Sequence, residues 1–175
     1  MPTVAVVKGG QLGIDLNYIG SNRAYGLGDS YMSDGGGEYL YVLFNSAVNQ
    51  GGMCKIELSP ASYRASAVTG ANLTSADSRL GFAQTTFAAS QYGFLALAGQ
   101  SVLVRTLGGV TGGGGQPMYT TGTAGALSTA SSSASQFQVW GVWLKSSVSA
   151  TAATATVSTA AVSYAHLRKP TAGGG

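Results

Sequence analysis

Three carboxylates, Asp29, Asp34 and Glu38, lie close together near the N-terminal end of the sequence. Paired carboxylates hydrolyse glycosidic bonds when one is held protonated and the other ionised, so these residues are candidates for a glycosidase. They lie in or beside the Gly-rich residues 26–37, whereas catalytic acids need a fixed geometry and a desolvated pocket. We therefore favour solvated loop carboxylates, or a weak cation site, over an enzyme.

The chain has one cysteine and one histidine, Cys54 and His166. This pair excludes an internal disulfide and a closed zinc site. Cys54 falls in an expected strand and is interpreted as a small buried apolar residue. His166 is interpreted as a surface or interface residue, because no Asp or Glu follows Asp77 in the sequence to orient it as a base. We expect no catalytic residue, no metal and no cofactor, and hence no enzyme.

The glycine clusters do not match phosphate-binding loops. Gly112–Gly115 is followed by Gln116 and Pro117, where a P-loop requires Lys and Ser or Thr. Residues 26–28 lack the third glycine and the strand-to-helix setting of a dinucleotide-binding turn. Both clusters are predicted to be loops.

The composition excludes several other classes of protein. Only 9% of the 175 residues are charged, against roughly 25% in a typical soluble protein. This chain therefore has too few charged residues for a coiled coil. With 45% hydrophobic residues and a net charge of +3, disorder is not expected either. All six acids lie in the first 77 residues, and the five bases after them are too dispersed for a nucleic-acid site. No apolar segment is long enough for a signal peptide or a membrane helix, so neither nucleic acid nor a membrane is an expected partner.

Short runs of β-branched and aromatic residues, separated by Gly, Ser and Asn, predict an all-β fold. We expect a compact β-barrel or β-sandwich of short antiparallel strands with Gly-rich loops. The expected strands are 3–7, 38–44, 53–58, 79–87, 92–98, 101–107, 117–121, 136–145 and 155–167. Gly99-Gln100 is expected to close a hairpin. Residues 63–76 and 125–135 are expected to hold one helical turn each at most, and no internal repeat with a convincing period is visible.

Three regions are expected along the chain. Residues 1–37 are predicted to be an extended N-terminal arm with a Gly-rich loop, able to pack on a neighbouring molecule. Residues 38–167 are predicted to form the all-β domain, and residues 168–175 a flexible C-terminal tail.

Aromatic residues gather on the strongest predicted strands. Residues 38–44 and 136–145 are apolar on both faces, with Trp140 and Trp143 expected on opposite sides. A domain of this size cannot easily cover both faces of such strands, and hardly any charge protects the strand edges. We therefore expect a subunit of a permanent assembly in which one face meets another molecule. The predicted interface residues are Tyr39, Tyr41, Trp140, Trp143 and Tyr164.

A series of short landmarks follows the chain: YIG at 18–20, EYLYVLF at 38–44, MCKIEL at 53–58, LGFAQ at 80–84, SQYGF at 90–94, GQSVLV at 99–104, MYTT at 118–121, VWGV at 139–142 and VSYAHL at 162–167. Their order resembles that of the small capsid decoration (cement) proteins of tailed bacteriophages. The resemblance covers residues 18–167 and brings no catalytic residues with it.

The resemblance implies a structural virion protein on the outer face of an icosahedral capsid, which it stabilises against internal DNA pressure. Its implied partners are the major capsid protein and further copies of itself, in a homotrimer or another small homo-oligomer. The first alternative is a tail or fibre component that binds a host surface glycan through aromatic platforms and Gly-rich loops. The second is the carboxylate-based glycosidase.

Overall fold

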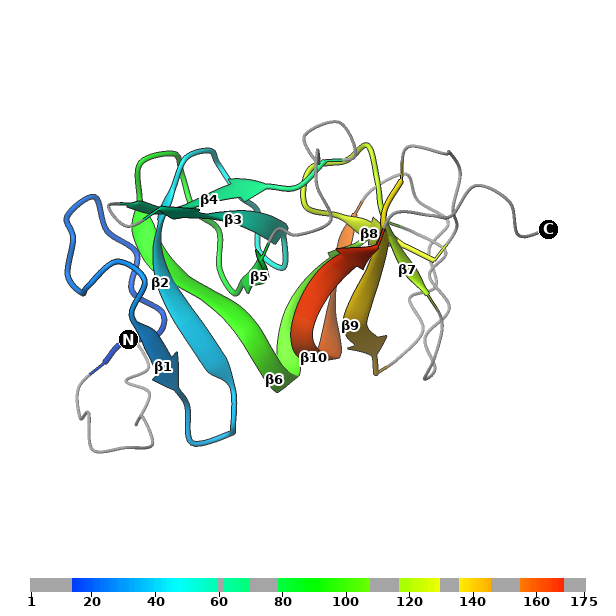
Figure 1. Ribbon diagram of the computed structural model, residues 1–175, viewed down its shortest axis with the longest axis horizontal. Helices are drawn as coiled ribbons and strands as arrows, with labels where there is room; N and C mark the ends of the chain where they lie inside the picture. Colours follow the sequence, from blue (N-terminus) through cyan, green and yellow to red (C-terminus); the bar gives the residue numbers. More distant parts are fainter. Residues whose placement is uncertain are drawn as a thin grey trace.

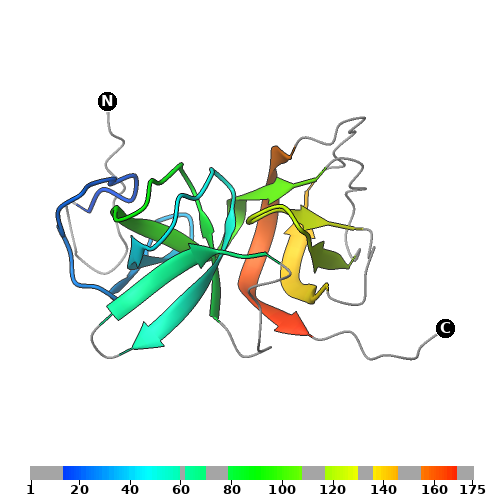
Figure 2. The ribbon, with the colours of Figure 1, turned by 90° about the horizontal axis from the view of Figure 1, so that it is seen from above.

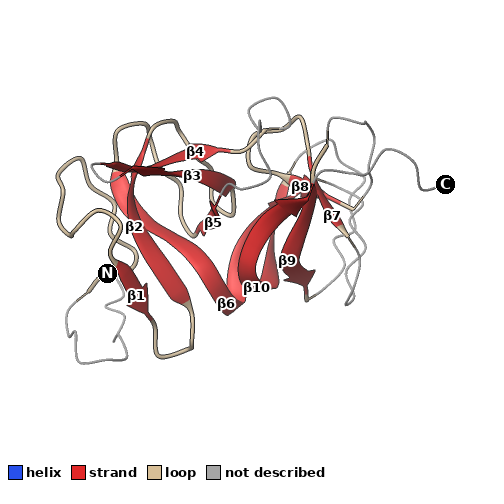
Figure 3. Ribbon diagram, in the orientation of Figure 1, coloured by secondary structure: helices blue, strands red, loops and turns tan. Residues whose placement is uncertain are grey.

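The computed structural model describes residues 14–59, 62–69, 79–107, 117–129, 136–145 and 155–168. Within these ranges the chain forms ten strands and no helix (Figures 1 and 3), which confirms the predicted all-β fold. Accordingly, no helix of membrane-spanning length and apolarity occurs there. The strands are β1 (Ser30–Met32), β2 (Glu38–Phe44), β3 (Met53–Ser59), β4 (Ser62–Ala67), β5 (Arg79–Ala83), β6 (Tyr92–Thr106), β7 (Met118–Thr120), β8 (Leu127–Ser128), β9 (Gln138–Leu144) and β10 (Thr156–Arg168).

The strands close into two five-stranded rings that share β6. The first ring has the order β2-β4-β3-β5-β6 and closes because β6 also pairs with β2. The second has the order β6-β10-β9-β7-β8 and closes because β8 also pairs with β6. β1 is added beside β2. Figures 1 and 2 show the rings as two lobes along the long axis of the molecule.

Both rings have the same strand order, which is an internal repeat that the sequence pattern does not reveal. When the strands of each ring are counted in chain order, the first strand (β2 or β6) pairs in parallel with the third (β4 or β8). All other pairs are antiparallel. The parallel pairs also match in their hydrogen bonds. Asn45 N–H donates to the Ala65 carbonyl and Leu107 N–H to the Leu127 carbonyl, both at 2.8 Å. The aligned first strands, 38–44 and 100–106, have a single identical residue, Val42 and Val104, so the repeat lies in the backbone rather than in residue identity.

β6 is one continuous strand of 15 residues, and the hairpin predicted at Gly99-Gln100 was wrong. The first half of β6 pairs with β2 and β5, and the second half pairs with β10. Gly99 has a φ of +152°, and the β10 register shifts beside it. The glycine therefore bends the strand from one ring into the other without reversing it.

Other predicted elements also differ from the structure. Residues expected to hold helical turns form β4 and β8 where they are described. The strand expected at 3–7 lies outside the described residues, as does the expected tail apart from Arg168.

The interior of the first ring and its outer surface are both apolar. Inside, Leu40, Val42 and Phe44 of β2 pack in a fully buried cluster. On the outside, Tyr41 and Phe94 are covered by residues 14–31 of the same chain. The described part of the expected arm therefore packs on its own domain and explains why both faces of 38–44 are apolar.

A second cluster joins the two rings. Met53, Leu80 and Phe82 point outward from the first ring into the core of the second, which contains Val102, Val104, Val142 and Leu167. The lobes are therefore packed together through a continuous apolar core.

The Gln84 side chain makes hydrogen bonds to the β6 backbone of the kind that a neighbouring strand would make. Leu103 N–H donates to Gln84 Oε1 at 2.9 Å, and Gln84 Nε2 donates to the Leu103 carbonyl at 3.3 Å. Gln50 Nε2 in turn donates to the Gln84 carbonyl at 3.0 Å.

Replacing Gln84 with alanine is expected to lower the free energy of unfolding by about 1–3 kcal/mol, because the Leu103 backbone groups lose their partner. Urea unfolding of the variant measures this loss. The exposed Gln100 gives a matched control, since Gln100→Ala is expected to change stability by less than about 0.5 kcal/mol. Equal losses for both variants would show that the Gln84 amide contributes nothing.

Candidate interaction surface

Gly141 creates an irregularity in β9 that redirects its side chains. Gly141 has a φ of +80°, and a Cβ at this position would lie 2.5 Å from the Ser163 carbonyl oxygen. The opposite stretch of β10 also bulges, because Val162 pairs with Val142 whereas His166 pairs with Trp140. Only glycine fits such a conformation at such a close approach.

The bulge places both tryptophans on the outer face of the second ring. Val139, Val142 and Leu144 point inward and are buried, whereas Trp140 and Trp143 are 43% and 45% exposed. The prediction that they point to opposite sides was wrong, because it assumed regular alternation through Gly141. A shallow pocket of about 300 Å³ lies beside them, lined also by Pro117 and Gln138.

The strand registers extend this outer surface over β10 and the second half of β6. Directly paired residues have their side chains on the same side of a sheet. Trp143 pairs with Ala161, Leu103 with Thr159, and Arg105 with Val157, which is 45% exposed. We call this surface the aromatic face; its residues are Ser101, Leu103, Arg105, Trp140, Trp143, Lys145, Val157, Thr159, Ala161 and His166.

The charge of the aromatic face is positive. It contains Arg105 and Lys145, and Lys145 Nζ donates to Ser101 Oγ at 3.0 Å. No Asp or Glu follows Asp77 in the sequence, so the second ring offers these cations no carboxylate. Aromatic, aliphatic and cationic side chains together favour a protein partner that supplies apolar groups and carboxylates.

Tyr164, a predicted interface residue, is exposed but connected to the first ring. It is 55% exposed, and its hydroxyl donates to Glu38 Oε2. This hydrogen bond, together with the negative charge of Glu38, raises the pKa of Tyr164. Arg79 Nη2 lies 3.5 Å from Glu38 Oε1, and within the described ranges this is the one ion pair. Tyr164 thus connects the bulge of β10 to the start of β2.

Tyr41 does not belong to an interface, which corrects the sequence prediction. Its side chain is fully buried, and its ring contacts those of Tyr18, Tyr25, Tyr92 and Phe94. Its hydroxyl accepts a hydrogen bond from Ala24 N–H at 3.0 Å. Burial raises the pKa of Tyr41. This side chain holds residues 14–31 on the first ring and is not available to another molecule.

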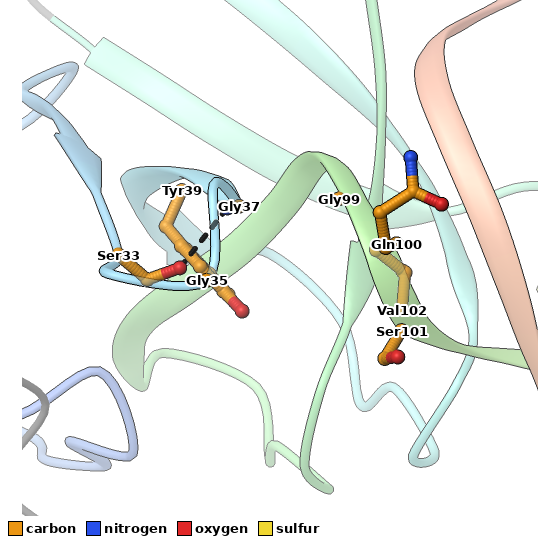
Figure 4. A pocket seen from close by; sticks show the side chains of 8 residues that line it. All are labelled: Ser33, Gly35, Gly37, Tyr39, Gly99, Gln100, Ser101 and Val102. Atoms are coloured by element: carbon orange, nitrogen blue, oxygen red, sulfur yellow. Dashed lines mark hydrogen bonds between the residues drawn. The ribbon is translucent and has the colours of Figure 1, made fainter.

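Tyr39 is half-buried and lines a second pocket, of about 190 Å³ (Figure 4). Ser33 and Tyr39 lie on one side of this pocket, and Gln100 and Ser101 lie on the other. Gly37 N–H donates to Ser33 Oγ at 3.0 Å. The lining offers hydroxyl and amide groups beside an aromatic ring but no acid or base, so it is suited to hydrogen bonding and not to proton transfer.

The three candidate carboxylates do not form a common site. Asp29 and Asp34 are exposed, and Glu38 is bound by Arg79 and Tyr164. Tyr41 N–H donates to the Asp29 carbonyl, which places Asp29 about 10 Å along β2 from Glu38. Among the residues that the structure describes, no three His, Cys, Asp or Glu side chains are grouped to hold a metal ion.

Cys54 and His166 lie where the sequence indicated. Cys54 is buried inside the first ring, which raises the pKa of its thiol, and its Sγ lies 3.7 Å from the Gly52 carbonyl. His166 is exposed on the aromatic face, with Nδ1 3.4 Å from the Tyr164 carbonyl.

Tyr31 is expected to make the free energy of unfolding fall at alkaline pH. Its burial, followed by the negative charge of Asp29 and a hydrogen bond to it, raises the pKa of Tyr31 to about 12. The unfolded chain loses this proton near pH ~10, so the stabilisation is complete below that pH and is lost as the pH rises through the folded value. The stabilisation from this group is therefore expected to be lost between about pH 10 and about pH 12.

Ultraviolet titration of tyrosinate, with Tyr31→Phe as the difference reference, measures this pKa. Asp29→Asn is expected to lower it, because both the charge and the carboxylate acceptor are removed. Asp34→Asn is the control and should leave it unchanged; equal effects of the two variants would contradict the assignment.

Comparisons with protein families, with curated proteins and with solved structures found no match to this chain.

Proposed function

We propose that the chain is a structural virion protein that binds the outer surface of a bacteriophage capsid and stabilises the shell. The observation that supports this most is the aromatic face, where Trp140 and Trp143 are 43% and 45% exposed on β9, because such a surface suits a lasting contact between neighbouring molecules of an assembled shell. Tryptophan is enriched at protein interfaces, and contiguous exposed apolar surface marks interaction sites. The order of sequence landmarks, which resembles that of decoration proteins, supports the same function.

The architecture suits a protein that binds an existing surface many times. Both rings are closed, so they offer few free strand edges for uncontrolled pairing. A standard interface buries about 800 Å² on each partner, and several such contacts in one oligomer add avidity without any catalytic chemistry. The partners proposed are the major capsid protein and further copies of this chain.

Trp143→Ala is expected to weaken oligomer formation or attachment to particles by about tenfold or more, as for an exposed aromatic residue central to an interface. The chain should still fold, because this side chain contributes little to the core. Leu58, which is 59% exposed on β3, gives a matched control for loss of an exposed apolar side chain. Sizing of the purified chains and their occupancy on purified particles are the measurements. Unchanged values for Trp143→Ala would contradict a role of the aromatic face.

Imaging of particles that carry a labelled copy tests the proposed location. A shell protein appears at hundreds of positions over the capsid, whereas a tail or fibre protein appears at a few positions on the tail.

The alternative function is a tail or fibre component that binds a host surface glycan. The pocket between Ser33, Tyr39, Gln100 and Ser101 favours it, because hydroxyl and amide groups beside an aromatic ring can hydrogen-bond a sugar. Label confined to the tail, together with glycan binding that Gln100→Ala abolishes, would replace the capsid proposal with this one.

A further inference from the structure

The internal repeat shows that one outer surface is covered in the first ring but open in the second. When the two parallel pairs, β2–β4 and β6–β8, are aligned by their register, Leu103 occupies the position of Tyr41. Tyr41 pairs with Phe94, and both are buried beneath residues 14–31; Leu103 pairs with Thr159, and both are partly exposed. The segment that precedes the first strand of the second ring is the first half of β6, which is already built into the other ring. The chain therefore cannot repeat this cover by the same route.

The fourth strands of the two rings in chain order, β5 and β9, differ in the same way. Cys54 pairs with Gly81 in the first ring, and the corresponding Met118 pairs with Val139 in the second. The next residues, Phe82 and Trp140, are thus counterparts. Phe82 is fully buried between the rings, whereas Trp140 is 43% exposed. The second ring buries the outward aromatic side chain Phe82 of the first ring, whereas the corresponding side chain in the second ring, Trp140, stays partly exposed to solvent.

The complementary surface lies in the other lobe. We call it the β1 end, and it consists of Met32 and Asp34. Asp34 is exposed, and Met32 is 44% exposed. Asp29 lies on the other side of β1, where its carboxylate accepts a hydrogen bond from the hydroxyl of the buried Tyr31. β1 pairs with β2 on one side, and its other edge has no partner among the described strands. Figures 1 and 2 place β1 and β9 in different lobes of the elongated molecule, so one chain cannot bring these two surfaces together.

We infer that the aromatic face of one molecule binds the β1 end of a second copy, head to tail. Asp34 of one copy supplies a carboxylate to Arg105 and Lys145 of the next, and Met32 meets the tryptophans. A face-to-face pairing about a two-fold axis is disfavoured, because it would place the cations of one copy against those of the other. The place of this contact in the virion rests on the proposed function. The inference adds which molecule lies next to each subunit.

A head-to-tail contact uses two different surfaces of each subunit, so it generates a ring when the rotation closes. A small cyclic homo-oligomer, such as the homotrimer that the resemblance implies, is one product of such a contact, and an open filament is the other. Each copy then keeps its remaining surface for the capsid.

Reciprocal charge reversal tests the contact on the purified full-length chain. Arg105→Glu/Lys145→Glu and Asp34→Lys are each expected to weaken self-association by about tenfold or more, because like charges then face each other. The chain that carries all three substitutions is expected to associate again. Sizing with light scattering at micromolar concentration, at low and high salt, measures the mass.

Two further measurements separate association from folding. Thermal unfolding of each variant confirms that it is folded. Tryptophan fluorescence of the wild-type chain is expected to shift to shorter wavelength as concentration rises, since Trp140 and Trp143 leave water on association.

A wild-type chain that stays monomeric would overturn the inference, as would a three-substitution chain that stays dissociated. Loss of association with the face variant but not with the β1-end variant would also overturn it, in favour of a face-to-face contact. Particle binding is scored separately: a monomer that occupies capsids overturns this inference alone, whereas head-to-tail oligomers that never occupy capsids overturn the proposed function alone.

Discussion

Replacing Tyr41 with alanine is expected to lower the free energy of unfolding by about 3–5 kcal/mol, which is the range for removing a large aromatic side chain from a core. Tyr41 is fully buried, and four aromatic rings lie around it, those of Tyr18, Tyr25, Tyr92 and Phe94. The cavity would lie between the first ring and the segment that covers it, so residues 14–31 should detach before the rest unfolds.

Denaturant unfolding measures the loss for Tyr41→Ala, and limited proteolysis locates it. Tyr41→Phe is the matched control, because it keeps the ring and removes only the hydroxyl that accepts from Ala24 N–H. We expect that control to cost about 0.5–1.5 kcal/mol. Similar losses for the two variants would show that the hydroxyl, and not the ring packing, holds the segment.

Gly141→Ala is the second variant with a large expected effect, a loss of about 2–4 kcal/mol. Two costs add. A side chain is strained at a φ of +80°, and its Cβ would lie 2.5 Å from the Ser163 carbonyl oxygen. If β9 relaxes toward regular alternation to relieve the clash, Trp140 and Trp143 no longer share one face, and self-association should weaken with stability.

Gly36 separates these two costs. It has a φ of +76°, and no atom lies within 4 Å of the place that a Cβ would occupy, so Gly36→Ala carries the backbone strain without the clash. Its expected cost is about 1–2 kcal/mol. Thermal unfolding of both variants, with sizing of each, is the measurement. If Gly141→Ala costs no more than Gly36→Ala and leaves sizing unchanged, the bulge does not depend on glycine.

The strands marked by runs of β-branched and aromatic residues were predictable from sequence. Residues 38–44 form β2 with the predicted bounds, and 155–167 differ from β10 by one residue at each end. The continuous strand through Gly99-Gln100 was not predictable from the same signal, since a glycine within a strand pattern fits a turn or a bend equally. What decides between them is the pairing of each half with different neighbours, and that information lies far away in the sequence.

The candidate surface was predictable only in part. Trp140, Trp143 and Tyr164 were chosen as aromatic residues on strong strands and are exposed, whereas Tyr41 met the same criterion and is buried. The difference comes from residues 14–31, whose cover of the first ring has no periodic signal. The isolated Gly141 between two apolar pairs was the available signal for a bulge, and with it the two tryptophans would have been placed together. Arg105 and Lys145 were missed because their alignment with the tryptophans depends on strand register.

The continuity of β6 also determines how the molecule bears force. Tandem modules joined by a flexible linker usually swing relative to each other, but here the connection is a hydrogen-bonded strand embedded in both barrels. Among the described residues, β6 passes from one lobe into the other as an unbroken strand. Tension applied to one lobe is therefore expected to pass along the β6 backbone into the other, so that the two lobes move as one body.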